Sequence, residues 1–281
     1  MSYLHRRLSI CPRPRYPTGM TSHPREWNSS QYHQLSDPQF QWGLKVLERL
    51  VLRGDEAVLD AGCGTGRVTA ELARQLPRGR VIASDVSENM LGNARENLAD
   101  FGDQVSFLQA YMADLPLDNE VDCVFSTAAF HWVQDHDALF QSLFRALRTG
   151  GKLIAQCGGD PNLEKTYSRA KQVIAEKKEF AHYFHNFSEP VHFASPEQTS
   201  GRLRRAGFAD AEAWLESTPA TIGDAQTYRE FLQTVVLRAH VAKLPIAGAE
   251  YLLHRMRELG AEDDPAFTLD YWRLNINANK T

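Results

Sequence analysis

Five short apolar runs, each separated from the next by a longer polar or amphipathic stretch, constrain the fold of this chain more than any other feature. The runs cover residues 57–62, 80–85, 105–110, 121–127 and 152–158. Continuous apolarity over so few residues is typical of parallel strands buried on both faces. Three of the intervening stretches have helical spacing, at residues 67–75, 87–100 and 136–147, the last followed by Thr149-Gly150-Gly151 as a stop. This alternation predicts right-handed crossovers and a doubly wound α/β fold with helices on both faces of the sheet.

The regular alternation ends at Gly159. Residues 163–187 look helical and then become rich in aromatic residues and histidine, so we expect them over the carboxyl edge of the sheet. Further helices are expected at 36–52, 195–207, 225–240 and 247–259, and further strands at 208–216 and 268–277. The mixed apolar and polar character of the last segment, TLDYWRLNIN, favours an edge strand.

These patterns suggest one domain preceded by a leader. Residues 1–25 contain four prolines and five arginines with no acidic residue, which predicts a disordered basic leader. Residues 26–281 are expected to form a single domain, because no linker or repeat interrupts them. Within it, residues 54–158 form the cofactor-binding core, and residues 159–206 and 222–262 form a helical cap on the substrate side.

The charge distribution argues for a small-molecule substrate. The net charge is −4, and without the five arginines of the leader the rest of the chain carries −9. An acidic body repels a phosphate backbone, so we expect no nucleic-acid partner. No apolar run reaches the length of a membrane span, and the four cysteines contain no CxxC pair. We therefore expect a cytoplasmic protein, monomeric or homodimeric, with reduced thiols and no membrane partner.

A glycine-rich loop follows the first strand directly and opens the first helix. It reads Asp60-Ala61-Gly62-Cys63-Gly64-Thr65-Gly66-Arg67. Its glycines let the backbone turn sharply and approach a ligand closely. The dinucleotide fingerprint GxGxxG requires glycine where Arg67 stands, so the spacing here is GxGxG. Asp85, at the end of the second strand, is placed to accept hydrogen bonds from two ribose hydroxyls. Together they predict a cofactor that contains adenosine.

The segments VLDAGCGTGRVTAELA and ASDVSENMLGNAREN resemble the class I S-adenosylmethionine methyltransferase family. The resemblance implies a Rossmann-like seven-stranded sheet, mostly parallel with the last strand antiparallel, a helical cap, and S-adenosyl-L-methionine as cofactor. It also implies contacts from the loop to the amino acid part of the cofactor, from Asp85 to the ribose, and from further residues to the adenine and the rest of the molecule. The expected cofactor-binding residues are Tyr32, Asp60, Gly62, Cys63, Gly64, Gly66, Asp85, Val86, Met90, Met112, Ala113 and Ser126.

One position departs from the family pattern. Many members have an aspartate where this chain has Tyr111, and that aspartate accepts a hydrogen bond from the adenine amino group. A phenol hydroxyl accepts less readily than a carboxylate. Asp114, or the backbone at Met112 and Ala113, is expected to substitute.

The end of the fourth strand, STAAFHWVQDHDALF, is similar to the trans-aconitate methyltransferase-like branch of the family. The similarity extends to WNSSQY at residues 27–32 and to the closing LDYWRLNIN. This branch methylates carboxylates of small organic acids. The resemblance implies that Tyr32 closes over the cofactor and that Tyr32, His131 and Trp132 line the substrate pocket.

The acceptor decides the role of His131, the candidate catalytic residue. A carboxylate is already ionised at pH 7 and needs no base, so His131 would orient the substrate. A hydroxyl or an amine of a natural product would need a base, and His131 is the best-placed one. A cofactor-binding protein without turnover is a third reading, suggested by Tyr111. No metal site is expected, because His182 and His185 lack a third ligand.

Overall fold

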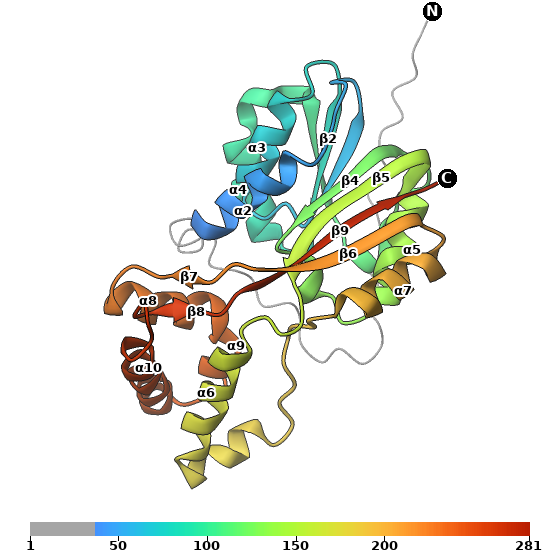
Figure 1. Cartoon of the computed structure of the whole chain (residues 1–281). Coiled ribbons are helices and arrows are strands. Elements are labelled where there is room, and N and C mark those ends of the chain that lie inside the picture. The colour runs from blue at the N-terminus through green and yellow to red at the C-terminus, as the bar shows by residue number, and fades with distance from the viewer. Residues whose placement is uncertain (1–36) are drawn as a thin grey trace, which may run out of the picture.

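A seven-stranded sheet forms the centre of the molecule (Figure 1). The structure is a computed structural model, and it describes residues 37–281. The strand order is β3-β2-β1-β4-β5-β9-β6. The strands are β1 Ala57–Ala61, β2 Arg80–Asp85, β3 Val105–Gln109, β4 Val121–Thr127, β5 Leu147–Gly158, β6 Ala209–Ser217 and β9 Trp272–Asn279. β1 to β5 pair in parallel, and β9 is antiparallel to both of its neighbours. The predicted Rossmann-like sheet with an antiparallel last strand is therefore confirmed.

The strand order reverses beside β1. β1 pairs with β2 on one side and with β4 on the other, and Val58 lies opposite both Val81 and Cys123. In open α/β sheets, the loops that leave the carboxyl ends of such strands turn to opposite faces and leave a crevice that binds ligands. The glycine loop after β1 lies at this point.

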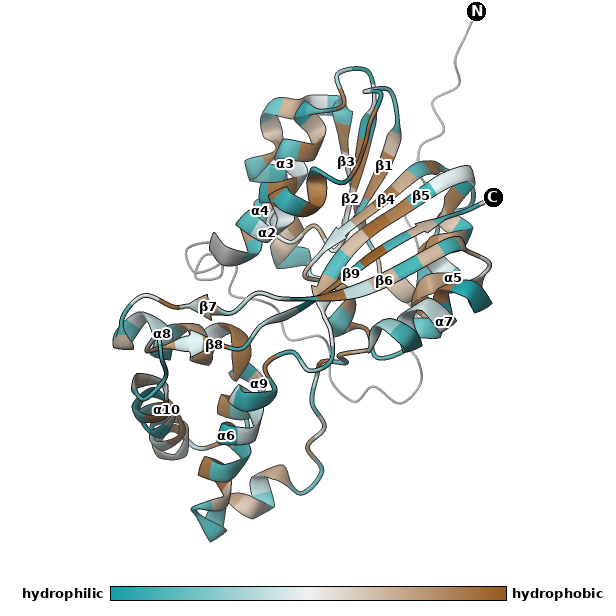
Figure 2. Cartoon of the chain, viewed as in Figure 1, coloured by the Kyte–Doolittle hydropathy of each residue, from teal (hydrophilic) through white to brown (hydrophobic). Residues whose placement is uncertain are grey.

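Helices cover both faces of the sheet. α2 Asp37–Leu47, α3 Arg67–Arg74 and α4 Glu88–Asn97 share one apolar core with the strands, which includes Val46, Leu72 and Ala94. α5 His136–Ala146 and α7 Pro196–Ala206 cover the other face (Figure 1). In Figure 2 the central strands are mostly brown, whereas the helices also carry teal segments. The strands are thus buried on both faces, as their continuous apolarity predicts.

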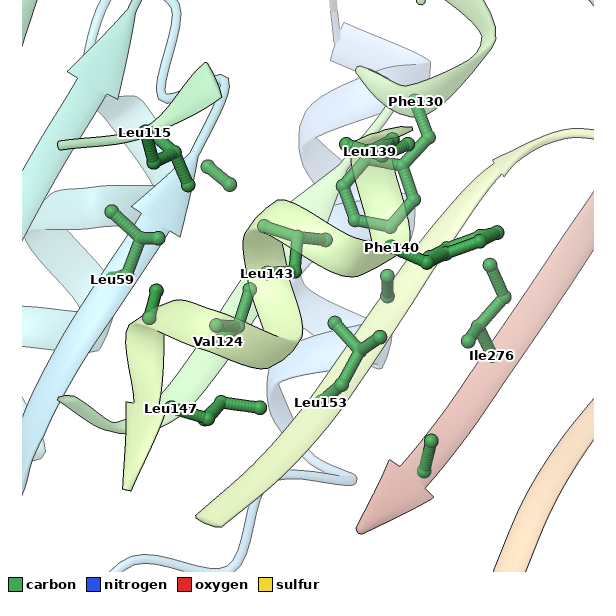
Figure 3. Close-up of a cluster of buried hydrophobic side chains, with 14 of the residues drawn as sticks. Leu59, Leu115, Val124, Phe130, Leu139, Phe140, Leu143, Leu147, Leu153 and Ile276 are labelled. Atoms are coloured by element: carbon green, nitrogen blue, oxygen red, sulfur yellow. The ribbon is translucent and has the colours of Figure 1, made fainter. Parts of the chain in front are cut away.

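The core beneath α5 is dense. Leu139, Phe140 and Leu143 of α5 share one core with Val124 and Leu153 of the sheet. Figure 3 shows the Phe140 ring extending toward Ile276 of β9. The three α5 side chains are at most 1% exposed. Burying each contributes roughly 1.5–3 kcal/mol of transfer free energy.

A separate helical unit is built from segments that lie between β5 and α7 and between β6 and β9 in the chain (Figure 1). It contains α6 Glu164–Ala175, the 3-10 helix Lys178–Phe184, α8 Ala225–Phe231, the π-helical turn Leu232–Val236, α9 Arg238–Val241, α10 Ile246–Ala261 and the two-stranded pair β7 Ala220–Thr221 and β8 Thr268–Leu269. Its core is distinct from those of the sandwich and is built around Tyr228, Phe231, Leu252 and Met256. Among residues 37–281, no helix combines the length and apolarity that crossing a bilayer requires.

Three local expectations differ from the structure. β9 is not an edge strand, because it pairs with both β5 and β6. The polar side chains of Asn275 and Asn277, which suggested an edge, accept hydrogen bonds from Arg49. β5 begins at Leu147, directly after α5, so Gly150 and Gly151 lie inside a strand rather than in a stop. The helix expected at 225–240 is broken by a π-helical turn.

α7 also belongs to a different part of the fold from α6. It packs against α5 and β6 through Leu203, which lies in the core of the sandwich. Ser195 caps its start and Gly207, with φ of 106°, ends it as the sequence predicts. The stretch 159–206, expected as one cap segment, is therefore divided between the helical unit and the sandwich.

Candidate active site

The glycine loop turns tightly at the carboxyl end of β1. Gly62, Gly64 and Gly66 all have positive φ, between 55° and 83°. The N–H groups of Gly62 and Cys63 both donate to the carbonyl of Ser84, at 2.8 and 2.9 Å. A Cβ on Gly62 would lie 2.4 Å from the Cβ of Ala129, whereas one on Gly64 would meet no atom within 4 Å. The loop is thus closely packed on one side and open at Gly64.

Asp85 is oriented by backbone amides. Its Oδ2 accepts the N–H of Gly64 at 3.0 Å, and its Oδ1 accepts the N–H of Ser87 at 2.9 Å. These two bonds fix the orientation of the carboxylate, which has about four acceptor positions. The carboxylate of β2 and the glycine loop of β1 are therefore held together as one unit.

Asp60 is a buried carboxylate beneath the loop. It is 3% exposed, and its Oδ2 accepts the hydroxyl of Thr69 at 2.6 Å. Burial raises the pKa of Asp60 to about 7, the Thr69 bond opposes the shift, and the charge of Asp85 adds to it. A positively charged group bound beside Asp60 would lower this pKa again.

The other predicted cofactor-binding residues lie around the same loops. Val86 and Met90 follow β2, and Met90 is buried in the first turn of α4. Met112 and Ala113 follow β3 in a short 3-10 helix and are half-buried. Ser126 is 1% exposed and donates to the carbonyl of Ala61 at 2.6 Å, so its hydroxyl joins β4 to β1.

Three further predictions concern residues 32, 63 and 111. Tyr32 lies outside the described residues. Cys63 is half-buried, and burial raises the pKa of its thiol well above its usual value, so it is a poor nucleophile. Burial also raises the pKa of Tyr111, with help from the charge of Asp135, while a backbone hydrogen bond from Gln134 opposes the shift. The Tyr111 hydroxyl therefore lies toward the loop before α5.

His131 reaches the end of β5. After β4 the chain turns at Ala128, which has φ of 55° and donates its N–H to Gln156 at 2.8 Å. The 3-10 helix Phe130–Trp132 then places His131 so that its Nδ1 accepts the N–H of Gly158 at 3.3 Å. Burial lowers the pKa of His131 to about 3, and Arg273 and His136 contribute to the shift. The imidazole is neutral, and with Nδ1 accepting, its proton is on Nε2.

Aromatic side chains surround His131. The ring of Trp132, which is 36% exposed, lies 5.2 Å from the imidazole, and that of Phe193 lies 5.7 Å from it. Phe193 and Tyr167, with ring centroids 6.3 Å apart, also line a cavity of about 390 Å³ just beyond the end of β5. His131 and Trp132 therefore stand beside a hollow that the helical unit helps to form.

One charged group at this edge has no signal in the local sequence. Arg273, 3% exposed, lies on β9 opposite Gly158 of β5. Its Nε donates to Oε1 of Gln156 at 3.3 Å, and its guanidinium lies 4.7 Å from the ring centre of Trp42 on α2. Only the pairing of β9 with β5 brings it near His131, so no local pattern could have found it.

His182 and His185, the two histidines that lie three residues apart, do not belong to a group of potential metal ligands among the described residues. His182 lies against Tyr183, with ring centroids 3.8 Å apart. In the part of the chain that the structure describes, no three His, Cys, Asp or Glu side chains gather as ligands.

The fold and these loops define a class I S-adenosylmethionine-dependent methyltransferase, and comparison with known proteins agrees. A methyltransferase-domain family matches residues 58–151. Phosphoethanolamine N-methyltransferase 2 of Haemonchus contortus, solved with S-adenosylhomocysteine, superposes with a TM-score of 0.58 at 20% identity. The superposition covers 90% of this chain and 57% of the nematode chain, and at this identity it supports the fold alone.

Curated relatives identify the family more closely. A trans-aconitate 2-methyltransferase of Variovorax paradoxus is 29% identical over 78% of this chain and 83% of its own length. Another, from Afipia carboxidovorans, is 30% identical over 76% of this chain and 81% of its own length. The chain therefore belongs to the class I S-adenosylmethionine-dependent methyltransferases and is a homologue of the trans-aconitate 2-methyltransferases. It is a small-molecule methyltransferase that uses S-adenosyl-L-methionine.

Proposed function

We propose that this enzyme transfers the methyl group to a carboxylate of a small organic acid and that His131 orients this carboxylate. The observation that carries the proposal is the hydrogen bond from Gly158 N–H to Nδ1 of His131. Because that bond occupies the Nδ1 lone pair, the neutral ring presents Nε2–H, which donates and cannot accept a proton. A donor suits a carboxylate oxygen, and an ionised carboxylate needs no base.

The proposed cofactor-binding roles are those that the resemblance to the methyltransferase family implies. Asp85 receives the ribose hydroxyls, and Asp60 and the loop of Gly62, Cys63, Gly64 and Gly66 receive the amino acid part of the cofactor. Val86, Met90, Met112 and Ala113 enclose the adenine, and Ser126 supports the loop through Ala61. The residues present fit such a group, because Gly64 leaves open space and Asp60 is a buried carboxylate that a cation would stabilise.

For this reaction the protein mainly has to position the acceptor against the methyl group of the cofactor. The bound cofactor supplies a methyl group activated on a sulfonium, together with a neutral leaving group. His131 orients the acceptor carboxylate toward this methyl group. Holding two reactants in this way is worth up to about 7–11 kcal/mol of the barrier in well-oriented systems.

The relatives and the helical unit support the same proposal. The curated relatives are named for methylation of trans-aconitate, an organic acid. Residues 163–194 and 222–262 form the cap that selects the acid. The alternative of a hydroxyl or amine acceptor requires His131 as base, and a pKa of about 3 makes it a weak one.

The test is methyl transfer from labelled S-adenosylmethionine to a set of organic acids that includes trans-aconitate, with base-labile ester as the product. With saturating S-adenosylmethionine, whose positive charge lowers the pKa of Asp60, we expect ester formation at a rate that does not change between pH 6 and 8, because neither the acceptor carboxylate nor His131 titrates there. His131→Asn keeps a donor and is expected to retain the reaction.

Other outcomes would replace the proposal. A His131→Asn rate that is lost at pH 7 and restored at high pH would show that His131 acts as a base. Tight cofactor binding with no methylated product from any acid would support a binding protein without turnover.

A further inference from the structure

A buried asparagine side chain lies just beyond the end of β5. Asn162 is 4% exposed, and its N–H donates to the carbonyl of Gly159 at 2.7 Å, which closes the turn that leaves the strand. Its Oδ1 accepts the N–H of Trp272, the first residue of β9, at 2.9 Å. Because this donor occupies the amide oxygen, the NH2 group is the one that points away from Trp272. The fold therefore fixes the orientation of the Asn162 amide.

The other end of this amide is a hydrogen-bond donor that faces a cavity. No oxygen among residues 37–281 accepts a hydrogen bond from Nδ2 of Asn162, and this atom is not sealed from solvent. Asn162 also lines the cavity of about 390 Å³ beyond β5. Buried polar groups are normally hydrogen-bonded, and an unmade bond costs free energy. We therefore expect Nδ2 to bind an oxygen of the molecule that occupies the cavity.

This donor lies against the same residue as His131. A Cβ on Gly158 would lie 2.8 Å from Nδ2 of Asn162 and 2.7 Å from Cε1 of Phe193. The N–H of Gly158 donates to Nδ1 of His131, and the Phe193 ring lies 5.7 Å from the imidazole. Asn162, Phe193 and His131 thus converge on Gly158, at the carboxyl end of β5, where the proposed reaction places the acceptor.

The charge of the cavity limits which acid this donor can hold. Among the described residues that line it, Asp160, Glu164 and Glu189 supply carboxyl groups, and Lys171 supplies an ammonium group. The lining carries an excess of negative charge, so an acid with several carboxylates is repelled there. An acid with one carboxylate, held by a neutral donor, and with an uncharged or positively charged remainder fits this lining better.

We propose that Asn162 binds the carboxylate of a monocarboxylic acceptor by donating a hydrogen bond from Nδ2 to one of its oxygens. This inference rests on the proposed function, and it names both the class of acid and a residue that recognises it. A protonated amine in the same place would leave Nδ2 unpaired, because it has no lone pair with which to accept.

Equilibrium binding at pH 7 tests this assignment without requiring turnover. The full chain, saturated with S-adenosylhomocysteine, is titrated calorimetrically with butyrate, benzoate and trans-cinnamate, with the tricarboxylate trans-aconitate, and with the neutral ester methyl benzoate. Asn162→Asp keeps an oxygen for the N–H of Trp272 but replaces the donor by an acceptor, and Asn162→Ala removes the donor without adding charge. The matched control is Ser168→Asp, which adds a carboxylate to the same cavity and leaves the Asn162 amide in place.

We expect at least one monocarboxylate to bind, and to bind more tightly than trans-aconitate and methyl benzoate. Asn162→Asp and Asn162→Ala should each weaken its binding roughly 10- to 100-fold, because a hydrogen bond to a charged group is lost. Ser168→Asp should weaken it less than either. Affinity for S-adenosylhomocysteine should equal that of the wild type in every variant, which also shows that each is folded.

Binding of none of the monocarboxylates would overturn the assignment, as would tighter binding of trans-aconitate than of any of them. Normal affinity in Asn162→Asp with a loss in Asn162→Ala would show that Asn162 serves only to bind Trp272. Equal losses in Asn162→Asp and Ser168→Asp, with normal affinity in Asn162→Ala, would show an effect of charge alone and would also refute the proposal. If Asn162→Ala does not fold, the comparison of Asn162→Asp with Ser168→Asp decides.

The reaction is scored separately from binding. Asn162-dependent binding of a monocarboxylate without ester formation would retract carboxyl methylation and keep Asn162 as a carboxylate-binding residue. Ester formation by Asn162→Ala with an unchanged KM for the acid would retract the role of Asn162 and keep the reaction.

Discussion

Single hydrogen bonds decide what the site residues can do. His131 could be either a base or a donor by residue type, and the N–H of Gly158 makes it a donor. His136 is similar, since its Nε2 lies 3.0 Å from the carbonyl of Phe130, which can only accept. Burial lowers the pKa of His136 to about 4, so both rings are neutral at physiological pH. At this edge, therefore, neither imidazole carries a positive charge at physiological pH.

Asp60 is expected to make the cofactor-free protein less stable as the pH rises. Its folded pKa of about 7 lies above the unfolded value of 3.8, so between these values the native state binds more protons. By linkage, the free energy of unfolding falls as the pH rises from about 4 to 7, by an amount on the order of 4 kcal/mol. Asp60→Asn should flatten this slope in urea unfolding measured from pH 5 to 8.

Cofactor binding should also depend on the protonation state of Asp60. A cation bound beside Asp60 lowers its pKa, so binding of S-adenosylhomocysteine at pH 7 should release part of a proton. Calorimetry in buffers of different ionisation enthalpy measures that release. An equal release from Asp60→Asn would contradict the assignment.

At the scale of elements, the packing at the end of β5 depends on Gly158, which has no side chain. A Cβ on Gly158 would lie 2.7 Å from Phe193 Cε1 and 2.8 Å from Asn162 Nδ2. Gly158→Ala must therefore displace Phe193, move the N–H that binds His131, or both. We expect a loss of about 1–3 kcal/mol in stability and a larger KM for the acceptor.

Gly92 provides the matched control for that variant. It lies in α4, and a Cβ there would meet no atom within 4 Å. Gly92→Ala should raise stability by up to about 1 kcal/mol, because alanine has the higher helix propensity. Thermal unfolding of both variants, with acceptor kinetics, makes the comparison. Equal effects from the two substitutions would refute the close approach at Gly158.

At the scale of the whole molecule, the sandwich and the helical unit have separate cores. The sandwich carries the glycine loop, and α6 of the helical unit lines the cavity beyond β5. Cofactor binding and acceptor binding should therefore be separable by mutation.

Gly260→Ala tests this separation. A Cβ at residue 260 would lie 2.6 Å from Cε1 of Tyr228, which is fully buried in the helical unit. We expect α10 to shift against α8 and the acceptor KM to rise several-fold, with the affinity for S-adenosylhomocysteine within twofold of the wild type. A parallel loss of affinity for S-adenosylhomocysteine would show that cofactor binding and acceptor binding are coupled.

Local patterns in the sequence determined the strands, the first helices and the glycine loop with its acid, because apolar period, glycine spacing and caps act over a few residues. They also determined the class of cofactor. Only the tertiary structure decided that β9 lies inside the sheet, that α7 joins α5, and that His131 is a neutral donor beside Arg273. Those facts depend on contacts between segments distant in the chain, and side-chain burial and tautomer follow from such contacts rather than from residue type.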